Sequence, residues 1–232
     1  MTLGIFDSGE GGHNLLRHAR LRNNRDDVLF LCDRARAPYG TKREYELLGI
    51  VDDNIRRLRS MGAERIIIAC CTACTVFDRL SDTDGVYPII PLTARAAAAA
   101  SDGSIAVIAT GRTVSSGAFR RAINDPQKEV KEIEAQTLVE LVERGACDEN
   151  ATPELYDYLT RLLARAEGAD TLILGCTHFS SVASTALDVG KRYGIRRVID
   201  AARIGAQLIP AAFDADGDGV DYIFNTVKTK HG

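Results

Sequence analysis

The sequence predicts an α/β fold of two similar lobes, each built on a mainly parallel sheet flanked by helices. Short β-branched runs alternate along the chain with longer amphipathic stretches, an order that is typical of α/β units. Runs such as residues 66–69 and 172–174 are apolar throughout, as expected of parallel strands buried on both faces. The two halves of the 232-residue chain also repeat one pattern, which favours two lobes over one.

Nine short segments are predicted to be strands from their β-branched and aliphatic residues: 3–6, 28–31, 65–69, 86–90, 105–109, 130–134, 171–174, 197–200 and 222–224. Helices are predicted between them. Apolar residues recur at helical spacing over residues 48–58, and Gly62 follows as a stop signal. A second apolar stripe covers residues 155–163, and Thr152 with Pro153 ahead of it are typical of a helix cap and first turn.

Charge and composition exclude several classes of protein. The chain has 29 Lys and Arg against 32 Asp and Glu, and this net charge of −3 argues against a nucleic-acid partner. No apolar run approaches the roughly 20 residues of a membrane span. The first residues lack the basic start and apolar core of a signal peptide. We therefore expect a cytoplasmic protein that binds neither nucleic acid nor membrane.

Cysteine spacing raises the question of a metal site. Cys71 and Cys74 have the C-x-x-C spacing of zinc and redox sites. A structural zinc site needs a second pair of ligands, and Cys176 with His178 are too closely spaced to supply it. We expect no metal here, and the alternative is that these cysteines are small buried hydrophobic residues.

An acidic segment near the end of the chain resembles another metal motif. Residues 214–219 match the first half of an EF-hand calcium loop, but the last ligand position holds Asn225 instead of Glu. We therefore expect an acidic turn without calcium.

The pattern that the two halves share is an apolar strand, a small residue, a cysteine and a nearby threonine, at residues 67–72 and 173–178. It puts Cys70 and Cys176 at the carboxyl ends of two strands, the edge at which open α/β sheets bind ligands. A helix that begins there favours a thiolate. Two thiols facing each other across a cleft are suited to inverting a stereocentre, since one removes a proton and the other returns one to the opposite face.

Four segments in the same order resemble motifs of the glutamate racemase family, within the aspartate/glutamate racemase superfamily. They are Asp7-Ser8-Gly9-Glu10-Gly11-Gly12, Ala35-Arg36-Ala37-Pro38-Tyr39-Gly40, Ala69-Cys70-Cys71-Thr72-Ala73 and Leu174-Gly175-Cys176-Thr177-His178-Phe179. The resemblance implies two pseudo-symmetric lobes with the active site in the cleft between them. It also implies that the C-terminus returns to the first lobe, so that residues 1–91 and 203–232 form one lobe and residues 92–202 the other.

The resemblance further implies a cofactor-independent amino-acid racemase that interconverts L- and D-glutamate for peptidoglycan synthesis. Its partner would be a small acidic amino acid, and a homodimer is a candidate assembly. Cys70 and Cys176 would be the acid/base thiols, assisted by Asp7 and His178 respectively. The implied substrate-binding residues are Ser8, Pro38, Tyr39, Gly40, Cys71, Thr72, Thr110, Thr113, Glu143 and Thr177.

Some residues depart from the family pattern. Cys71 stands where the family has Asn, and a thiol is a much weaker hydrogen-bonding group than an amide. Ala135 and Gln136 stand where the family has Cys-Pro. Two alternatives therefore stay open: a racemase for aspartate or another amino acid, and a weakly active relative that serves as a ligand-binding or interaction protein.

Overall fold

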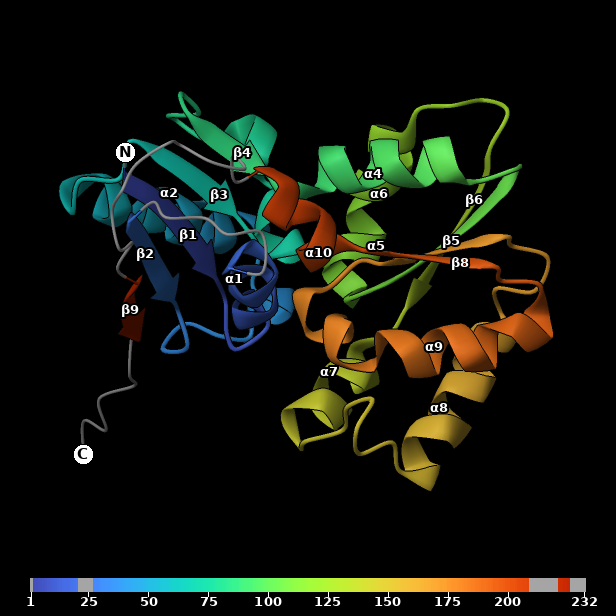
Figure 1. The fold of residues 1–232 in the computed structure, drawn as a ribbon. Coiled ribbons are helices and arrows are strands. Elements are labelled where there is room, and N and C mark those ends of the chain that lie inside the picture. The colour runs from blue at the N-terminus through green and yellow to red at the C-terminus, as the bar shows by residue number, and fades with distance from the viewer. Residues whose placement is uncertain (1, 21–26, 209–220, 226–232) are drawn as a thin grey trace.

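The structure, a computed structural model, describes residues 2–20, 27–208 and 221–225. Its strands form two parallel sheets, one in each half of the molecule in Figure 1. Among the described residues the first sheet has five strands in the order β4-β3-β1-β2-β9, and the second has four in the order β6-β5-β7-β8. The predicted α/β class with two parallel sheets is therefore confirmed.

The first sheet is built largely from the N-terminal part of the chain. Its strands are β1 (Thr2–Asp7), β2 (Asp27–Cys32), β3 (Arg65–Ile68), β4 (Val86–Pro88) and β9 (Asp221–Asn225). Its helical elements are α1 (Gly12–Arg20), η1 (Tyr39–Thr41), α2 (Glu44–Ser60), α3 (Cys71–Cys74) and η2 (Phe77–Arg79). Phe6 of β1 is in register with Leu31 of β2 and Ile68 of β3, so these strands end at one edge.

The second sheet repeats this arrangement. Its strands are β5 (Ser104–Ala109), β6 (Glu129–Glu134), β7 (Thr171–Leu174) and β8 (Arg197–Asp200). Helices α4 (Ile89–Ala100) and α6 (Ala118–Ile123) lie on one side of this sheet, and α8 (Pro153–Ala164) and α9 (Ala183–Gly190) on the other (Figure 1). The remaining elements are α5 (Gly111–Ser116), α7 (Gln136–Glu143), η3 (Thr177–Val182), η4 (Lys191–Tyr193), α10 (Ala201–Gly205) and η5 (Ala206–Leu208).

Strand predictions for all nine segments are confirmed within the described residues, with one correction. Residues 86–90 were expected to be a strand, but the strand ends at Pro88 and α4 begins at Ile89. Pro88 is the N-cap, and Pro91 lies in the first helical turn, where a missing N–H costs nothing. Ile89 and Ile90 are buried as helical residues, which is how this apolar pair is satisfied outside the sheet.

The predicted helix ends are also present. Gly62 follows α2 with φ of +96°, a conformation that glycine adopts without strain. Thr152 caps α8, since its hydroxyl accepts a hydrogen bond from the N–H of Leu155 at 3.2 Å.

Asp170 anchors the start of β7 to the loop before β5. One carboxylate oxygen accepts hydrogen bonds from the backbone N–H groups of Asp102, Gly103 and Ser104 at 3.1, 2.9 and 3.0 Å. Burial opposes the charged form, but these bonds, with those from Ser101 and Thr171, hold the pKa of Asp170 well below its usual range. The carboxylate therefore stabilises the second lobe in its ionised form.

Replacing Asp170 by Asn is expected to lower the free energy of unfolding at pH 7 by about 2–3 kcal/mol, because an amide cannot replace a charged multiple acceptor. The native pKa lies below the unfolded value of 3.8, so this stabilisation is fully present above that pH and is lost progressively as pH falls from it towards the native pKa. Urea unfolding at pH 7 and pH 3 would measure both effects. Asp188→Asn, at an exposed ion pair with Lys191, is the control. Equal stability of the Asp170→Asn and Asp188→Asn proteins at pH 7 would contradict the anchoring role.

Candidate active site

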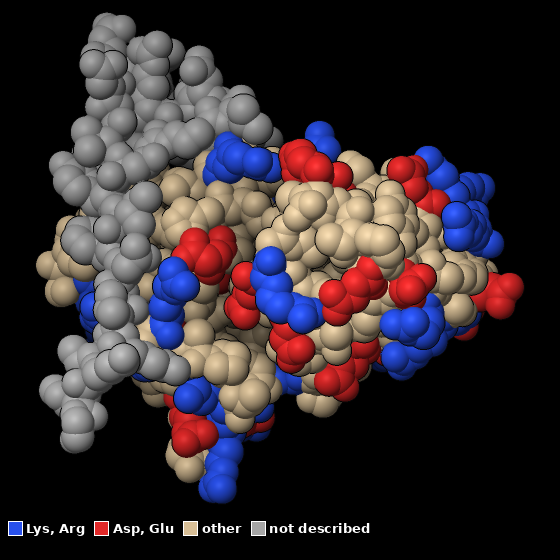
Figure 2. Space-filling model, turned by 90° about the horizontal axis from the view of Figure 1, so that it is seen from below, with Lys and Arg blue, Asp and Glu red and all other residues tan. Residues whose placement is uncertain are grey.

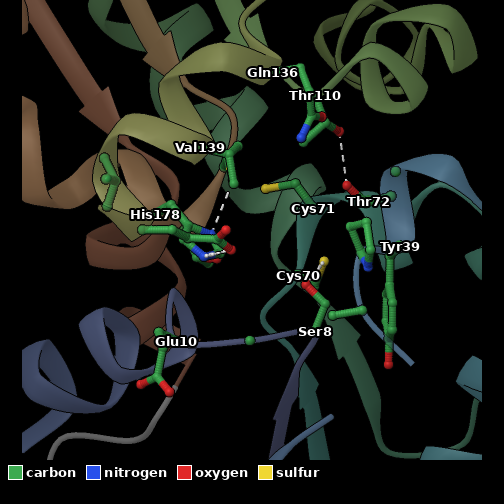
Figure 3. Close-up of a pocket in the computed structure, with 18 of the residues that line it drawn as sticks. Ser8, Glu10, Tyr39, Cys70, Cys71, Thr72, Thr110, Gln136, Val139 and His178 are labelled. Atoms are coloured by element: carbon green, nitrogen blue, oxygen red, sulfur yellow. Dashed lines mark hydrogen bonds and ion pairs between the residues drawn. The ribbon is translucent and has the colours of Figure 1, made fainter. Parts of the chain in front are cut away.

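A cavity of about 580 Å³ opens where the carboxyl ends of strands from both sheets approach each other. Figure 3 shows side chains from both halves of the chain pointing into it. The lining residues are Ser8, Gly9, Glu10, Arg34, Ala37, Pro38, Tyr39, Gly40, Cys70, Cys71, Thr72, Thr110, Gln136, Val139, Val142, Glu143, Cys176, Thr177 and His178. The structure thus brings together Cys70, Cys176, His178 and nine of the ten predicted substrate-binding residues.

The two thiols occupy equivalent positions in the two lobes. Cys70 follows β3 and is the N-cap of α3, and Cys176 follows β7 and is the N-cap of η3. Both cysteines are buried, neither forms a disulfide, and both line the cavity. The repeated strand-to-cysteine pattern of the sequence therefore corresponds to two thiols that share one cavity.

Cys70 is held in a setting that disfavours its charged form. Burial, and then the negative charge of Asp7, raise the pKa of the Cys70 thiol well above its usual value. The Ser8 hydroxyl lies 3.4 Å from the Cys70 sulfur and opposes this shift in part. Cys70 is consequently a neutral thiol at pH 7.

Cys176 lies beside a basic group, His178, and not beside a carboxylate. Its sulfur lies 3.6 Å from Nδ1 of His178, and Nε2 of that ring lies 3.5 Å from Oε1 of Glu143. Burial alone would lower the pKa of His178, but Cys176 and Glu143, with a smaller effect of Asp7, raise it to about 11. His178 in turn lowers the pKa of Glu143. The ring is therefore an imidazolium at pH 7, and its positive charge lies beside the Cys176 sulfur.

Asp7 lies behind the cavity wall and does not line it. Its carboxylate is fully buried and accepts hydrogen bonds from the N–H of Gly9 at 2.9 Å and from the Thr177 hydroxyl at 3.0 Å. Burial raises the pKa of Asp7, while the charge of His178 and these hydrogen bonds oppose that rise. Asp7 thus joins the loop after β1 to the start of η3 in the other lobe.

Gly11 of the first motif is explained by this junction. A Cβ on Gly11 would lie 2.3 Å from the Thr177 hydroxyl oxygen and 2.7 Å from Nδ1 of His178. A side chain at this position would therefore push Thr177 and His178 away from the loop after β1.

Three threonine hydroxyls meet at the side of the cavity away from His178 (Figure 3). Thr72 of α3 lies 2.9 Å from the hydroxyl of Thr110 and 3.3 Å from that of Thr113, measured between oxygens. Thr110 and Thr113 are themselves 2.9 Å apart. Thr72 and Thr110 line the cavity, whereas Thr113 is fully buried behind them. Thr113 can therefore orient the other two hydroxyls but does not itself face the cavity.

Tyr39 lines the cavity, and its hydroxyl points away from Cys70 and Ser8 (Figure 3). That hydroxyl donates to a carboxylate oxygen of Asp33 at 2.6 Å and accepts from the Asn54 amide at 2.9 Å. Arg36 binds the same Asp33 oxygen at 2.7 Å. This buried network holds the segment of Pro38, Tyr39 and Gly40 at the cavity.

Cys71 is a third thiol at the cavity, and Figure 3 shows its sulfur pointing inward between Val139 and Thr72. Burial, followed by the neighbouring thiols, raises its pKa well above the usual value. The family's amide is therefore replaced by a neutral, weakly polar group.

Several lining residues were not predicted: Gly9, Glu10, Arg34, Ala37, Gln136, Val139 and Val142. Glu10 occupies the variable position of the first motif, and Arg34 lies just ahead of the second. Val139 and Val142 share a face of α7 with Glu143, so a helical projection of residues 136–143 could have found them.

Two further expectations concern metals and membranes. No group of three His, Cys, Asp or Glu that could hold a metal occurs in residues 2–20, 27–208 and 221–225. The acidic residues 214–219 lie outside the described part of the chain. Within that part, every helix is too short or too polar to span a bilayer.

Comparison with known proteins identifies relatives over most of the chain. Residues 16–209 match the family described as Asp/Glu/Hydantoin racemase. The glutamate racemase of Corynebacterium kroppenstedtii is 37% identical over 188 residues, which are 76% of this chain and 63% of that protein, less than two thirds of its length. The glutamate racemase of Neisseria meningitidis serogroup A is 32% identical over 238 residues, covering 96% of this chain and 86% of the relative.

Solved structures give the same result. The Aquifex pyrophilus glutamate racemase has a TM-score of 0.78 at 28% identity, with 99% of this chain and 90% of that chain covered. The RacE1 glutamate racemase of Bacillus anthracis has a TM-score of 0.84 at 24% identity, covering 97% and 88% of the two chains, and this likeness concerns the fold.

Proposed function

Because the chain belongs to the glutamate racemase family of the Asp/Glu/hydantoin racemases, we propose that it interconverts L- and D-glutamate without a cofactor. We further propose that it works in the cytoplasm and supplies D-glutamate for peptidoglycan. The observation that carries the activity is the pair of thiols, Cys70 and Cys176, at the wall of one cavity and at equivalent strand ends of two lobes.

The two thiols would act on opposite faces of the substrate. In one direction the Cys176 thiolate removes the α-proton, which breaks a C–H bond and forms an S–H bond. The Cys70 thiol gives its proton to the other face of the carbanion, which breaks an S–H bond and forms a C–H bond. The configuration is inverted, the atoms balance, and the reverse direction exchanges the two roles.

The surroundings of the thiols support this division of labour. Burial, and then the charge of Asp7, keep Cys70 protonated, so it is ready to donate. His178, whose Nδ1 lies 3.6 Å from the Cys176 sulfur, can exchange a proton with that sulfur during turnover. The two thiols would therefore work beside different neighbours, a carboxylate near Cys70 and an imidazolium near Cys176.

Neutral donors around the cavity would hold the substrate. The hydroxyls of Ser8, Thr72 and Thr110 and the backbone at Gly40 line it and can donate to carboxylate oxygens. Thr113 would act indirectly, by orienting Thr72 and Thr110.

A racemase for another amino acid is the second candidate, and Cys71 is the observation that favours it. The thiol points into the cavity where relatives are expected to present an amide, so a polar group of glutamate would lose a hydrogen-bonding partner. A smaller or less polar side chain would tolerate the thiol better.

Incubation with L-amino acids in deuterated water tests both candidates. We expect the α-proton NMR signal of L-glutamate to disappear and D-glutamate to accumulate to an equal concentration, because the enantiomers have equal free energy. Faster exchange of aspartate or a neutral amino acid would favour the second candidate. Absence of exchange with every amino acid would contradict a racemase function.

A further inference from the structure

An ion pair lies at the mouth of the cavity. Glu10 follows β1 and Arg34 follows β2, both residues line the cavity, and Nη1 of Arg34 is 2.5 Å from Oε1 of Glu10. The Arg34 side chain is 60% exposed and that of Glu10 is 54% exposed, so both lie at the outer end of the cavity. In Figure 3 the Glu10 carboxylate points away from Cys70 and Ser8. Figure 2 shows basic and acidic side chains close together around a hollow in one face of the molecule.

Arg34 is the only Lys or Arg at the cavity wall within the described residues. The other cationic group there is His178, which already contacts Cys176 and Glu143. Beside Glu10, the cavity is lined by a second carboxylate, that of Glu143 in the other lobe. The positive charge of Arg34 extends to it, because the pKa of Glu143 is lowered chiefly by His178 and in smaller part by Arg34. Arg34 therefore pairs with a carboxylate of the first lobe and acts at longer range on one of the second.

An acidic substrate meets an electrostatic problem at this mouth. It carries two carboxylates, and it must pass Glu10 and Glu143, which repel it. The hydroxyls deeper in the cavity are neutral donors. A guanidinium is planar and can bind a carboxylate through two parallel hydrogen bonds, so it can hold a substrate carboxylate as it holds Glu10.

We propose that Arg34 is a specificity-determining residue that binds the side-chain carboxylate of the substrate, and that Glu10 holds its guanidinium at the mouth until the substrate displaces it. This inference rests on the proposed function, since it assigns to Arg34 one carboxylate of an acidic amino acid. It predicts that the protein distinguishes a dicarboxylate from a monocarboxylate of similar length by means of this residue.

Binding of glutarate and butyrate, followed by NMR titration, tests the proposal without requiring turnover. The wild-type protein should prefer glutarate, and Arg34→Gln should reduce that preference about tenfold, the effect of one charge-assisted contact of roughly 1.4 kcal/mol. Arg34→Lys should retain part of it. Glu10→Gln should strengthen glutarate binding, because the competing carboxylate is removed. Arg144→Gln is the matched control, since Arg144 pairs with Glu154 at 3.1 Å with exposures of 62% and 65% and does not line the cavity.

The outcomes separate this inference from the proposed function. Equal losses of glutarate and butyrate binding in Arg34→Gln would mean that Arg34 only attracts anions, and would overturn the proposal. An unchanged preference would overturn it as well, even where the wild-type protein racemises glutamate. A lost preference in a protein that exchanges no α-proton would uphold the role of Arg34 and contradict the racemase function.

Discussion

Racemisation is expected to be lost when either Cys70 or Cys176 is replaced by Ser. Each face of the substrate needs its own acid/base group, and a serine hydroxyl is far too weak an acid to replace a thiol. General acid–base groups contribute about 10²–10⁴-fold to enzymatic rates, so we expect each substitution to lower kcat by at least about a hundredfold. The expected result follows from the presence of both thiols at one cavity.

The two variants should differ in what they retain. Each variant keeps one thiol, so each should still exchange the α-hydrogen of one glutamate enantiomer in deuterated water. The enantiomer that exchanges in the Cys70→Ser protein should be the one that does not exchange in the Cys176→Ser protein. Chiral chromatography measures racemisation and NMR measures exchange. Cys147→Ser is the matched control, because Cys147 is a free cysteine that does not line the cavity. Racemisation by Cys70→Ser at the wild-type rate would contradict the two-thiol mechanism.

The fold could be predicted because local patterns determine it. Continuous apolar runs are typical of strands that are covered on both faces, so the segments around Ile67 and Ile173 predict parallel sheets. The carboxyl ends of parallel strands meet at one edge, and this places Cys70 and Cys176 at comparable positions. The one error in strand extent, at Ile89 and Ile90, arose because β-branched residues are also compatible with a buried helix start.

The details of the site depend on packing between distant segments, which a local pattern does not contain. The pairing of Glu10 with Arg34 joins loops after two different strands. The hydroxyl of Tyr39 is turned away by Asp33 and Asn54, and Asn54 belongs to α2. Asp7 and Thr113 lie one layer behind the cavity for the same reason: their partners, Thr177 and Thr72, come from the opposite lobe.

Replacing His178 by Asn is expected to have the second large effect. The change removes the cation beside the Cys176 sulfur, and a charge-assisted contact of about 1.5–3 kcal/mol corresponds to a roughly tenfold to hundredfold loss in kcat. The pKa of His178 is raised to about 11, so its positive charge is present below that pH and is lost as pH rises through it. Between pH 6 and 9, therefore, the wild-type rate should show no titration of His178. His18→Asn, at a histidine that lies near Asp200 and does not line the cavity, is the control.

Kinetic isotope effects can show on which side of the substrate His178 acts. The ratio of kcat/KM for the two enantiomers stays at one in every variant, because it equals the equilibrium constant. When the Cys176 step becomes slowest, the effect of α-deuteration should increase for the enantiomer that Cys176 deprotonates. It should decrease for the other enantiomer, whose proton Cys70 removes in a step that is no longer limiting. Isotope effects that stay equal for both enantiomers in the His178→Asn protein would mean that His178 does not act through Cys176.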